Sequence, residues 1–203
     1  AAGNEVLADA NELHIPVGRP VVVDMVSEDV IHSFWVPRLG GKMDMIPGRV
    51  NRLKLQADRA GVYGGQCAEF CGGAHSLMGF VVVAHEPEAW QRWLDARLAR
   101  AAAAPALTAS AEARRGQQLF AEVGCAACHR IAGTAAQGSS GPDLTNIGSR
   151  RSLGAGILPN NRGTLIGWIG DSQSIKPNNR MPAYRSLRAD ELQALASYME
   201  SLQ

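Results

Sequence analysis

The stretch CAEFCGGAHSLM, residues 67–78, brings two cysteines, a glutamate, a histidine and a methionine together within one short segment. Thiolates, imidazoles and thioethers are soft or borderline ligands that suit copper or zinc better than calcium or magnesium. A disulfide between Cys67 and Cys71 is the alternative, but a bridge that closes so small a loop contributes little stability. The stretch therefore predicts a transition-metal site on a loop.

Length, charge and hydropathy narrow the setting of this site. The chain has 203 residues, of which 46% are hydrophobic, so it has room for one large domain or two small ones. Residues 1–100 carry 10 Lys/Arg and 12 Asp/Glu, and residues 101–203 carry 10 and 7, so neither half has the basic footprint of a nucleic-acid binder. No apolar run approaches the roughly 18 residues of a membrane helix, and neither an initiator Met nor a signal core opens the chain. We expect a processed mature form or a soluble fragment.

The pattern of residues 12–86 is typical of β-structure. PVVVDMVS (20–27) and VNRLKLQA (50–57) are short β-rich runs, and GFVVVAHE (79–86) reads as a buried strand. Pro/Gly turns separate the runs. Several short strands at this spacing predict an all-β Greek-key sandwich.

The pattern after this region becomes helical. Residues 87–104 predict a helix that ends in an Ala/Pro/Ser linker, residues 110–123 are amphipathic, and residues 189–203 place Leu192, Leu195, Met199 and Leu202 on one helical face. The predicted organisation is a β-domain over residues 1–96, a helix end and linker over 97–110, and an all-α domain over 111–203.

The second domain contains the motif CAACH, residues 125–129. C-x-x-C-H is the attachment signature of c-type haem, in which Cys125 and Cys128 form two thioethers and His129 is an axial iron ligand. The alternative is a thioredoxin-like redox pair, but that motif needs a βαβ context, and this segment follows a helix in a domain with no predicted strand. Met181 in NNRMPAY is the predicted second axial ligand, because Met199 belongs to the apolar face of the last helix.

Most of residues 110–203 resembles a small class I cytochrome c. GPDL after the haem histidine and the pattern Trp168, Ile169, Lys176, Pro177, Met181, Pro182 carry this resemblance. The resemblance implies that the Pro142 carbonyl holds the His129 ring N–H, and that Arg150 and Trp168 contact haem propionates. For Trp168, a packed core aromatic remains the alternative.

The first domain offers more donors than one copper ion needs. A mononuclear blue-copper site uses two His, one Cys and a weak Met on a cupredoxin sandwich. Here His32 and His75 accompany two cysteines and Met78, which suits two coppers bridged by both sulfurs, with a loop carbonyl as a further weak donor. Met43 and Met45 are rival thioethers without the loop spacing, and His14 and His85 lie outside every motif.

The pattern C-x-E-x-C-G-x-x-H-x-x-M, with HSFWVP and KMDMIPGR before it, resembles subunit II of haem–copper cytochrome c oxidases over residues 11–90. The resemblance implies a cupredoxin-like fold and the binuclear copper centre CuA. The implied ligands are His32, Cys67, the Glu69 carbonyl, Cys71, His75 and Met78. The Glu69 side chain resembles a Mg²⁺ ligand at the contact with subunit I. Subunit II of this family begins with two membrane helices, so the resemblance implies a soluble fragment of a membrane-anchored protein.

The implied function is electron relay at the periplasmic face of a bacterial membrane, from a donor through haem c to CuA and on to subunit I. The alternatives are a nitric-oxide reductase subunit and a copper chaperone or storage protein. A chaperone has no need of a fused haem.

Overall fold

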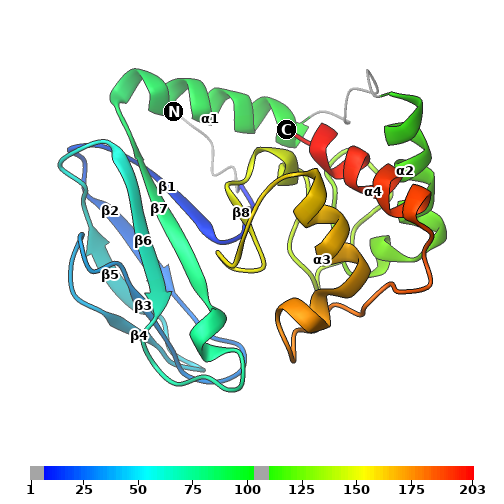
Figure 1. The fold of residues 1–203 in the computed structure, drawn as a ribbon. Coiled ribbons are helices and arrows are strands. Elements are labelled where there is room, and N and C mark those ends of the chain that lie inside the picture. The colour runs from blue at the N-terminus through cyan, green and yellow to red at the C-terminus, as the bar shows by residue number, and fades with distance from the viewer. Residues whose placement is uncertain (1–6, 103–109) are drawn as a thin grey trace. The chain divides into compact units, whose positions relative to one another are not determined.

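The computed structural model describes residues 7–102 and 110–203. The chain divides into two compact units (Figure 1). Among the described residues, one unit comprises Asn11–Trp93 and Ala155–Ile157, and the other comprises residues 7–10, 94–102, 110–154 and 158–203. Most of the expected linker, residues 103–109, lies outside the described residues. In the part of the chain that is described, no helix has the length and apolar character to span a bilayer.

The first unit contains seven strands arranged in two sheets (Figure 1). One sheet has five strands in the order β1-β7-β6-β3-β4, in which β1 and β7 are parallel and the other neighbours antiparallel. The strands β2 and β5 form a separate antiparallel ribbon. The bounds are β1 Glu12–Pro16, β2 Val21–Met25, β3 His32–Trp35, β4 Met43–Met45, β5 Asn51–Leu55, β6 Gly61–Cys67 and β7 Gly79–His85. A short 3-10 helix, η1, spans His75–Leu77.

Both sheets contribute to one buried core, which makes this unit a cupredoxin-like sandwich. Ile15 on β1, Tyr63 on β6 and Val82 on β7 are buried together with Leu55 of the ribbon. Val82, Val83 and Ala84 are buried on successive residues of β7, so both faces of this part of the strand are covered. The predicted all-β sandwich is confirmed.

Three predicted helices are present in the described residues, and a fourth, α3, was not predicted from the sequence. The helix α1 spans Pro87–Ala102, α2 spans Ala111–Glu122, α3 spans Arg162–Ile175 and α4 spans Ala189–Ser201. The short 3-10 helices η2 and η3 span Cys125–Ala127 and Ile147–Ser149. The Ser110 side chain caps α2 by accepting a hydrogen bond from the Ala113 N–H at 3.1 Å.

The helices α2 and α4 approach each other closely across the core of the helical unit. A Cβ atom at Gly116 would collide with the Ala194 carbonyl, so only glycine permits this approach. Leu119, Leu195 and Met199 are buried in the same core. Met199 is thus a core residue in the structure.

The sequence pattern predicts no strand in the helical domain, and the structure corrects this detail. A two-residue ribbon pairs β8 (Ser152–Leu153) with β9 (Leu158–Pro159). Its turn includes Ala155, a non-glycine residue at φ 68. Strands of two residues are too short to produce the alternation that identifies a strand in a sequence.

Candidate functional site

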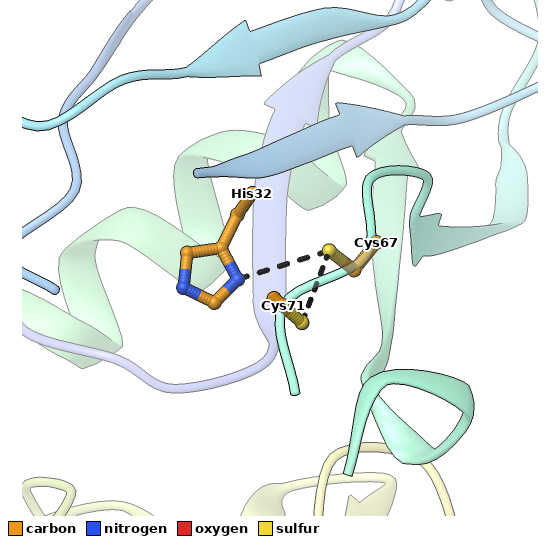
Figure 2. Close-up of side chains that lie close together, drawn as sticks. All are labelled: His32, Cys67 and Cys71. Carbon is orange, nitrogen blue, oxygen red and sulfur yellow. Dashed lines mark hydrogen bonds between the residues drawn. The ribbon is translucent and has the colours of Figure 1, made fainter. Parts of the chain in front are cut away.

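Two segments distant in sequence bring three of the predicted copper ligands, His32, Cys67 and Cys71, together (Figure 2). His32 opens β3, Cys67 closes β6 and Cys71 lies in the loop that follows. The strands β3 and β6 pair with Phe34 opposite Cys67, so the sheet register carries the histidine to the cysteine. His32 Nδ1 lies 3.8 Å from Cys67 Sγ. In the described ranges, these three are the His/Cys/Asp/Glu group whose ligand atoms all lie within 4.8 Å of one another.

The two cysteine sulfurs are close without being bonded. Cys67 Sγ and Cys71 Sγ are 3.7 Å apart, whereas the sulfurs of a disulfide are about 2.05 Å apart. Free thiols at this separation are placed to share metal ions between them. The disulfide alternative is not what the structure contains.

Each sulfur also has its own imidazole and its own weaker donor. The Glu69 carbonyl oxygen lies 3.2 Å from Cys67 Sγ, which also faces His32. His75 Nδ1 lies 3.5 Å from Cys71 Sγ, and Met78 Sδ lies 3.2 Å from the same sulfur. Each sulfur thus has one imidazole and one weaker donor close to it. Soft sulfur and imidazole donors in this arrangement fit two copper ions.

Backbone hydrogen bonds contribute to the shape of the loop. Cys67 N donates to the Met78 carbonyl at 3.0 Å, which closes the two ends of the loop. Gly72 has φ 118, a conformation that L side chains rarely adopt, and its carbonyl accepts from His75 N at 3.0 Å. The turn at Gly72 thus brings the second histidine back toward the cysteines.

Asp29 orients the first histidine, and sequence reasoning missed it. Its Oδ1 atom lies 2.9 Å from His32 Nε2, on the opposite side of the ring from Nδ1. Burial lowers the pKa of His32, but the Asp29 hydrogen bond and Cys67 outweigh it and raise that pKa. The same hydrogen bond lowers the pKa of Asp29 to about 2. The sequence feature that could have indicated this contact is the D-x-x-H spacing of Asp29 and His32.

The two thiols differ in acidity. Burial raises the pKa of Cys67, but hydrogen bonds from the backbone at Glu69 and Ser33 and from His32 outweigh it and lower the pKa to about 7. Burial and the neighbouring Cys67 raise the pKa of Cys71 to about 11. Without a metal, Cys67 is therefore the first of the pair to ionise.

The CAACH motif lies directly after α2. Cys125 begins η2, and both Cys128 N and His129 N donate to the Cys125 carbonyl, at 3.2 and 3.0 Å. His129 Nδ1 lies 2.8 Å from the Pro142 carbonyl oxygen, which leaves Nε2 available to a haem iron. A Cβ atom at Gly141 would crowd the same imidazole, so a glycine there leaves space for the ring.

The other predicted haem residues surround the same core. Trp168 and Met181 are half-buried against the core cluster of the helical unit. Tyr184, which sequence reasoning did not single out, packs there too and hydrogen-bonds with the Cys125 thiol. Burial and Cys125 raise the pKa of this tyrosine.

Arg150 is buried and already has partners in the structure. Its Nε donates to Asp9 Oδ1 at 2.9 Å, and its guanidinium also donates to the Asp143 carbonyl. Asp9 contacts a second arginine, Arg97, at 3.6 Å. The predicted propionate contact would therefore involve an arginine that also pairs with a carboxylate.

The two remaining histidines form a cluster of their own. His14 Nδ1 lies 2.8 Å from His85 Nε2, and the His14 ring stacks on Trp93 with centroids 4.3 Å apart. Both histidines lie on strands, β1 and β7, as expected for residues outside the motifs.

Two family models of known proteins match this chain, each over a different range of residues. Residues 1–85 match the family model described as the periplasmic domain of cytochrome c oxidase subunit II, and residues 113–203 match the cytochrome c model. The chain is thus similar to the first family over residues 1–85 and to the second over residues 113–203, and it joins a segment of each kind. The first family implies CuA copper and the second implies haem.

Two curated relatives match nearly the whole chain, and a solved structure matches part of it. Cytochrome c oxidase subunit 2 of Alkalihalophilus pseudofirmus is 41% identical over 98% of this chain and 56% of that protein. The subunit 2 of Bacillus sp. strain PS3 is 33% identical over 95% of this chain and 56% of that protein. A crystal structure of the periplasmic domain of subunit II of cytochrome oxidase from Bradyrhizobium japonicum is 34% identical, with a TM-score of 0.42, and covers 44% of this chain and 65% of that chain. The chain spans about half the length of the curated relatives it matches.

Proposed function

We propose that this chain relays single electrons within a haem–copper oxidase, from a donor through a covalently attached haem c to a binuclear copper centre and on to subunit I. The observation that carries the proposal is the pair of cysteine sulfurs 3.7 Å apart, each facing one imidazole. When bound, the copper pair and the haem would each supply one-electron redox chemistry without binding a substrate.

The chain's own residues would hold the copper. Both thiols must lose their protons and both imidazoles must be neutral before they ligate a metal. The lowered pKa of Cys67 favours the first of these steps near neutral pH. Asp29 accepts a hydrogen bond from His32 Nε2 and so directs Nδ1 toward the sulfur pair. This contact thus orients His32 for a metal.

His129 and Met181 would hold the haem iron. The Pro142 carbonyl orients the histidine ring. Cys125 and Cys128 would anchor the macrocycle, and Trp168, which packs against the core of this unit, would contact the propionates together with Arg150. A methionine opposite a histidine is the ligand pair of cytochromes c with raised reduction potentials.

Glu69 presents two different groups to two different surroundings. Its carbonyl oxygen faces Cys67 Sγ, whereas its side chain is 44% exposed and lies 3.3 Å from Lys42 Nζ. We assign the carboxylate to a Mg²⁺ shared with subunit I, and the carbonyl to the copper centre. The match to a periplasmic domain fits a periplasmic location, and we place the chain at the outer face of the cytoplasmic membrane.

Flash photolysis over a dilution series tests the relay. Rapid electron injection should reduce the haem first, and copper reduction should follow at a rate independent of protein concentration, because a short linker keeps the two sites at about millimolar effective concentration.

The control is an equimolar mixture of two variants, one lacking Cys67 and Cys71 and one lacking Cys125 and Cys128. In the mixture the same transfer should become concentration-dependent. A rate proportional to concentration in the intact chain would show that the two domains do not exchange electrons internally.

A further inference from the structure

The helix α3 changes direction before it ends. Asp171 has φ −152 and ψ 67, which is not helical, and the last turn of α3 follows it. Ser172 on that turn is fully buried, so the turn is fixed to the core of the helical unit. Gln173 is the next residue, and its side chain points to the loop that carries Met181.

The side-chain amide of Gln173 bridges two backbone carbonyls of this loop. Its Nε2 atom donates to the Met181 carbonyl at 2.7 Å and to the Asn179 carbonyl at 2.8 Å. An amide nitrogen has two hydrogens, so this pair of acceptors uses its full donor capacity. The bridge connects a turn that is fixed in the core to a loop with no regular structure.

Other side chains complete the restraint on Met181. The Asn179 Oδ1 atom accepts from Met181 N at 2.8 Å, and the Ser172 hydroxyl donates to the Met181 carbonyl at 3.1 Å. Asn179 belongs to the loop, and its Nδ2 atom donates to the Ser172 carbonyl at 3.1 Å. Gln173 and Ser172 connect Met181 to the helix directly, and Asn179 adds a link from within the loop.

We infer that Gln173 is a positioning residue for the haem ligand: it holds the Met181 backbone so that the thioether stays available to the iron. This inference rests on the proposed function, in which Met181 is the second axial ligand. Nothing in a C-x-x-C-H motif or in the Met-Pro pair requires a glutamine eight residues before the methionine, so the role follows from the geometry alone.

Competition with imidazole on the oxidised, haem-containing chain tests the inference. Added imidazole replaces the thioether when the loop moves away from the iron, and the sulfur-to-iron absorption band then disappears. Gln173→Ala should lower the imidazole concentration at half-loss of the band about tenfold, the effect of losing one or two net hydrogen bonds. Gln173→Leu, which keeps the bulk without the donor, should behave in the same way.

Asn160→Ala is the matched control. The Asn160 amide also bridges two carbonyls, those of Ile147 at 2.6 Å and Arg150 at 2.9 Å, but it does not touch the Met181 loop. This variant should lower thermal stability by an amount similar to Gln173→Ala while leaving the imidazole midpoint within about twofold of the parent chain.

The outcomes separate the inference from the proposal beneath it. If the parent chain has no sulfur-to-iron band, Met181 is not the ligand, and both fail. If the band is present and Gln173→Ala leaves the imidazole midpoint unchanged, or Gln173→Leu restores it, the positioning role is wrong and the relay proposal stands.

Discussion

Asp29 Oδ1 accepts a hydrogen bond from His32 Nε2 at 2.9 Å, while the other nitrogen of the same ring faces Cys67 Sγ at 3.8 Å. A carboxylate that fixes the tautomer of a ligating histidine usually contributes 10–100-fold to metal affinity. The loop ligands reach the site by local spacing, but His32 comes from a separate strand. Its orientation therefore depends on this contact.

Asp29→Asn should lower copper affinity about tenfold or more in a competition titration with a chelator, because the amide is a weaker acceptor and can rotate to present a donor to Nε2. Asp24→Asn is the matched control, since Asp24 is an exposed aspartate of the same unit that pairs with Arg52. Equal copper affinities for the two variants would show that Asp29 does not act on the metal.

The acidity of the two free thiols predicts a pH profile for the copper-free, haem-containing chain. A thiol is alkylated as its thiolate, whose fraction rises with pH through the pKa. Cys67 should reach half its limiting alkylation rate near pH 7 and Cys71 only near pH 11, as measured by mass spectrometry of the modified peptides. Two equal profiles centred near pH 9 would contradict the assigned hydrogen bonds.

The two methionines of the haem domain should respond differently to substitution. Met181→His replaces a thioether that favours ferrous iron, so it should lower the haem potential markedly, within the ~0.8 V range that axial ligands span, and abolish the sulfur-to-iron band. Met199→Leu should leave both unchanged, because Met199 is buried in the core. It should cost less than ~1.5 kcal/mol of stability, because leucine and methionine have similar volumes. The reverse pattern in spectroelectrochemistry would make Met199 the ligand.

The close approach of α2 and α4 predicts opposite results for two glycines. Gly116→Ala should destabilise the helical unit by about 1–3 kcal/mol, because the new methyl group would meet the Ala194 backbone. Gly167→Ala, at an open position on α3, should be neutral or stabilise by up to ~1 kcal/mol. Thermal unfolding followed by circular dichroism measures both, and equal effects would contradict the packing described.

Sequence patterns predicted what depends on local spacing. The strands β2, β5 and β7 followed from short β-rich runs, and Val82, Val83 and Ala84 of the β7 run are buried. Cys67, Cys71 and Met78 were found together because they lie within one loop. His32 is 35 positions from Cys67, and only the pairing of β3 with β6 brings it to the loop.

The sequence patterns did not predict contacts that depend on the tertiary fold. Asp29 is an exposed acidic residue of ordinary appearance in the sequence, and Tyr184 reaches Cys125 only after α3 and its loop have folded back. The break in α3 at Asp171 could not be predicted from a proline, because α3 contains none. Gln173 acquires its role from that break, because the turn after it aims the side chain at Met181.

Electron paramagnetic resonance of the copper-loaded, oxidised chain, combined with metal analysis, tests the central claim most directly. Two sulfurs 3.7 Å apart with one imidazole each predict two coppers per chain that share one unpaired electron, seen as hyperfine coupling to two equivalent nuclei. One copper per chain with coupling to a single nucleus would contradict the binuclear centre.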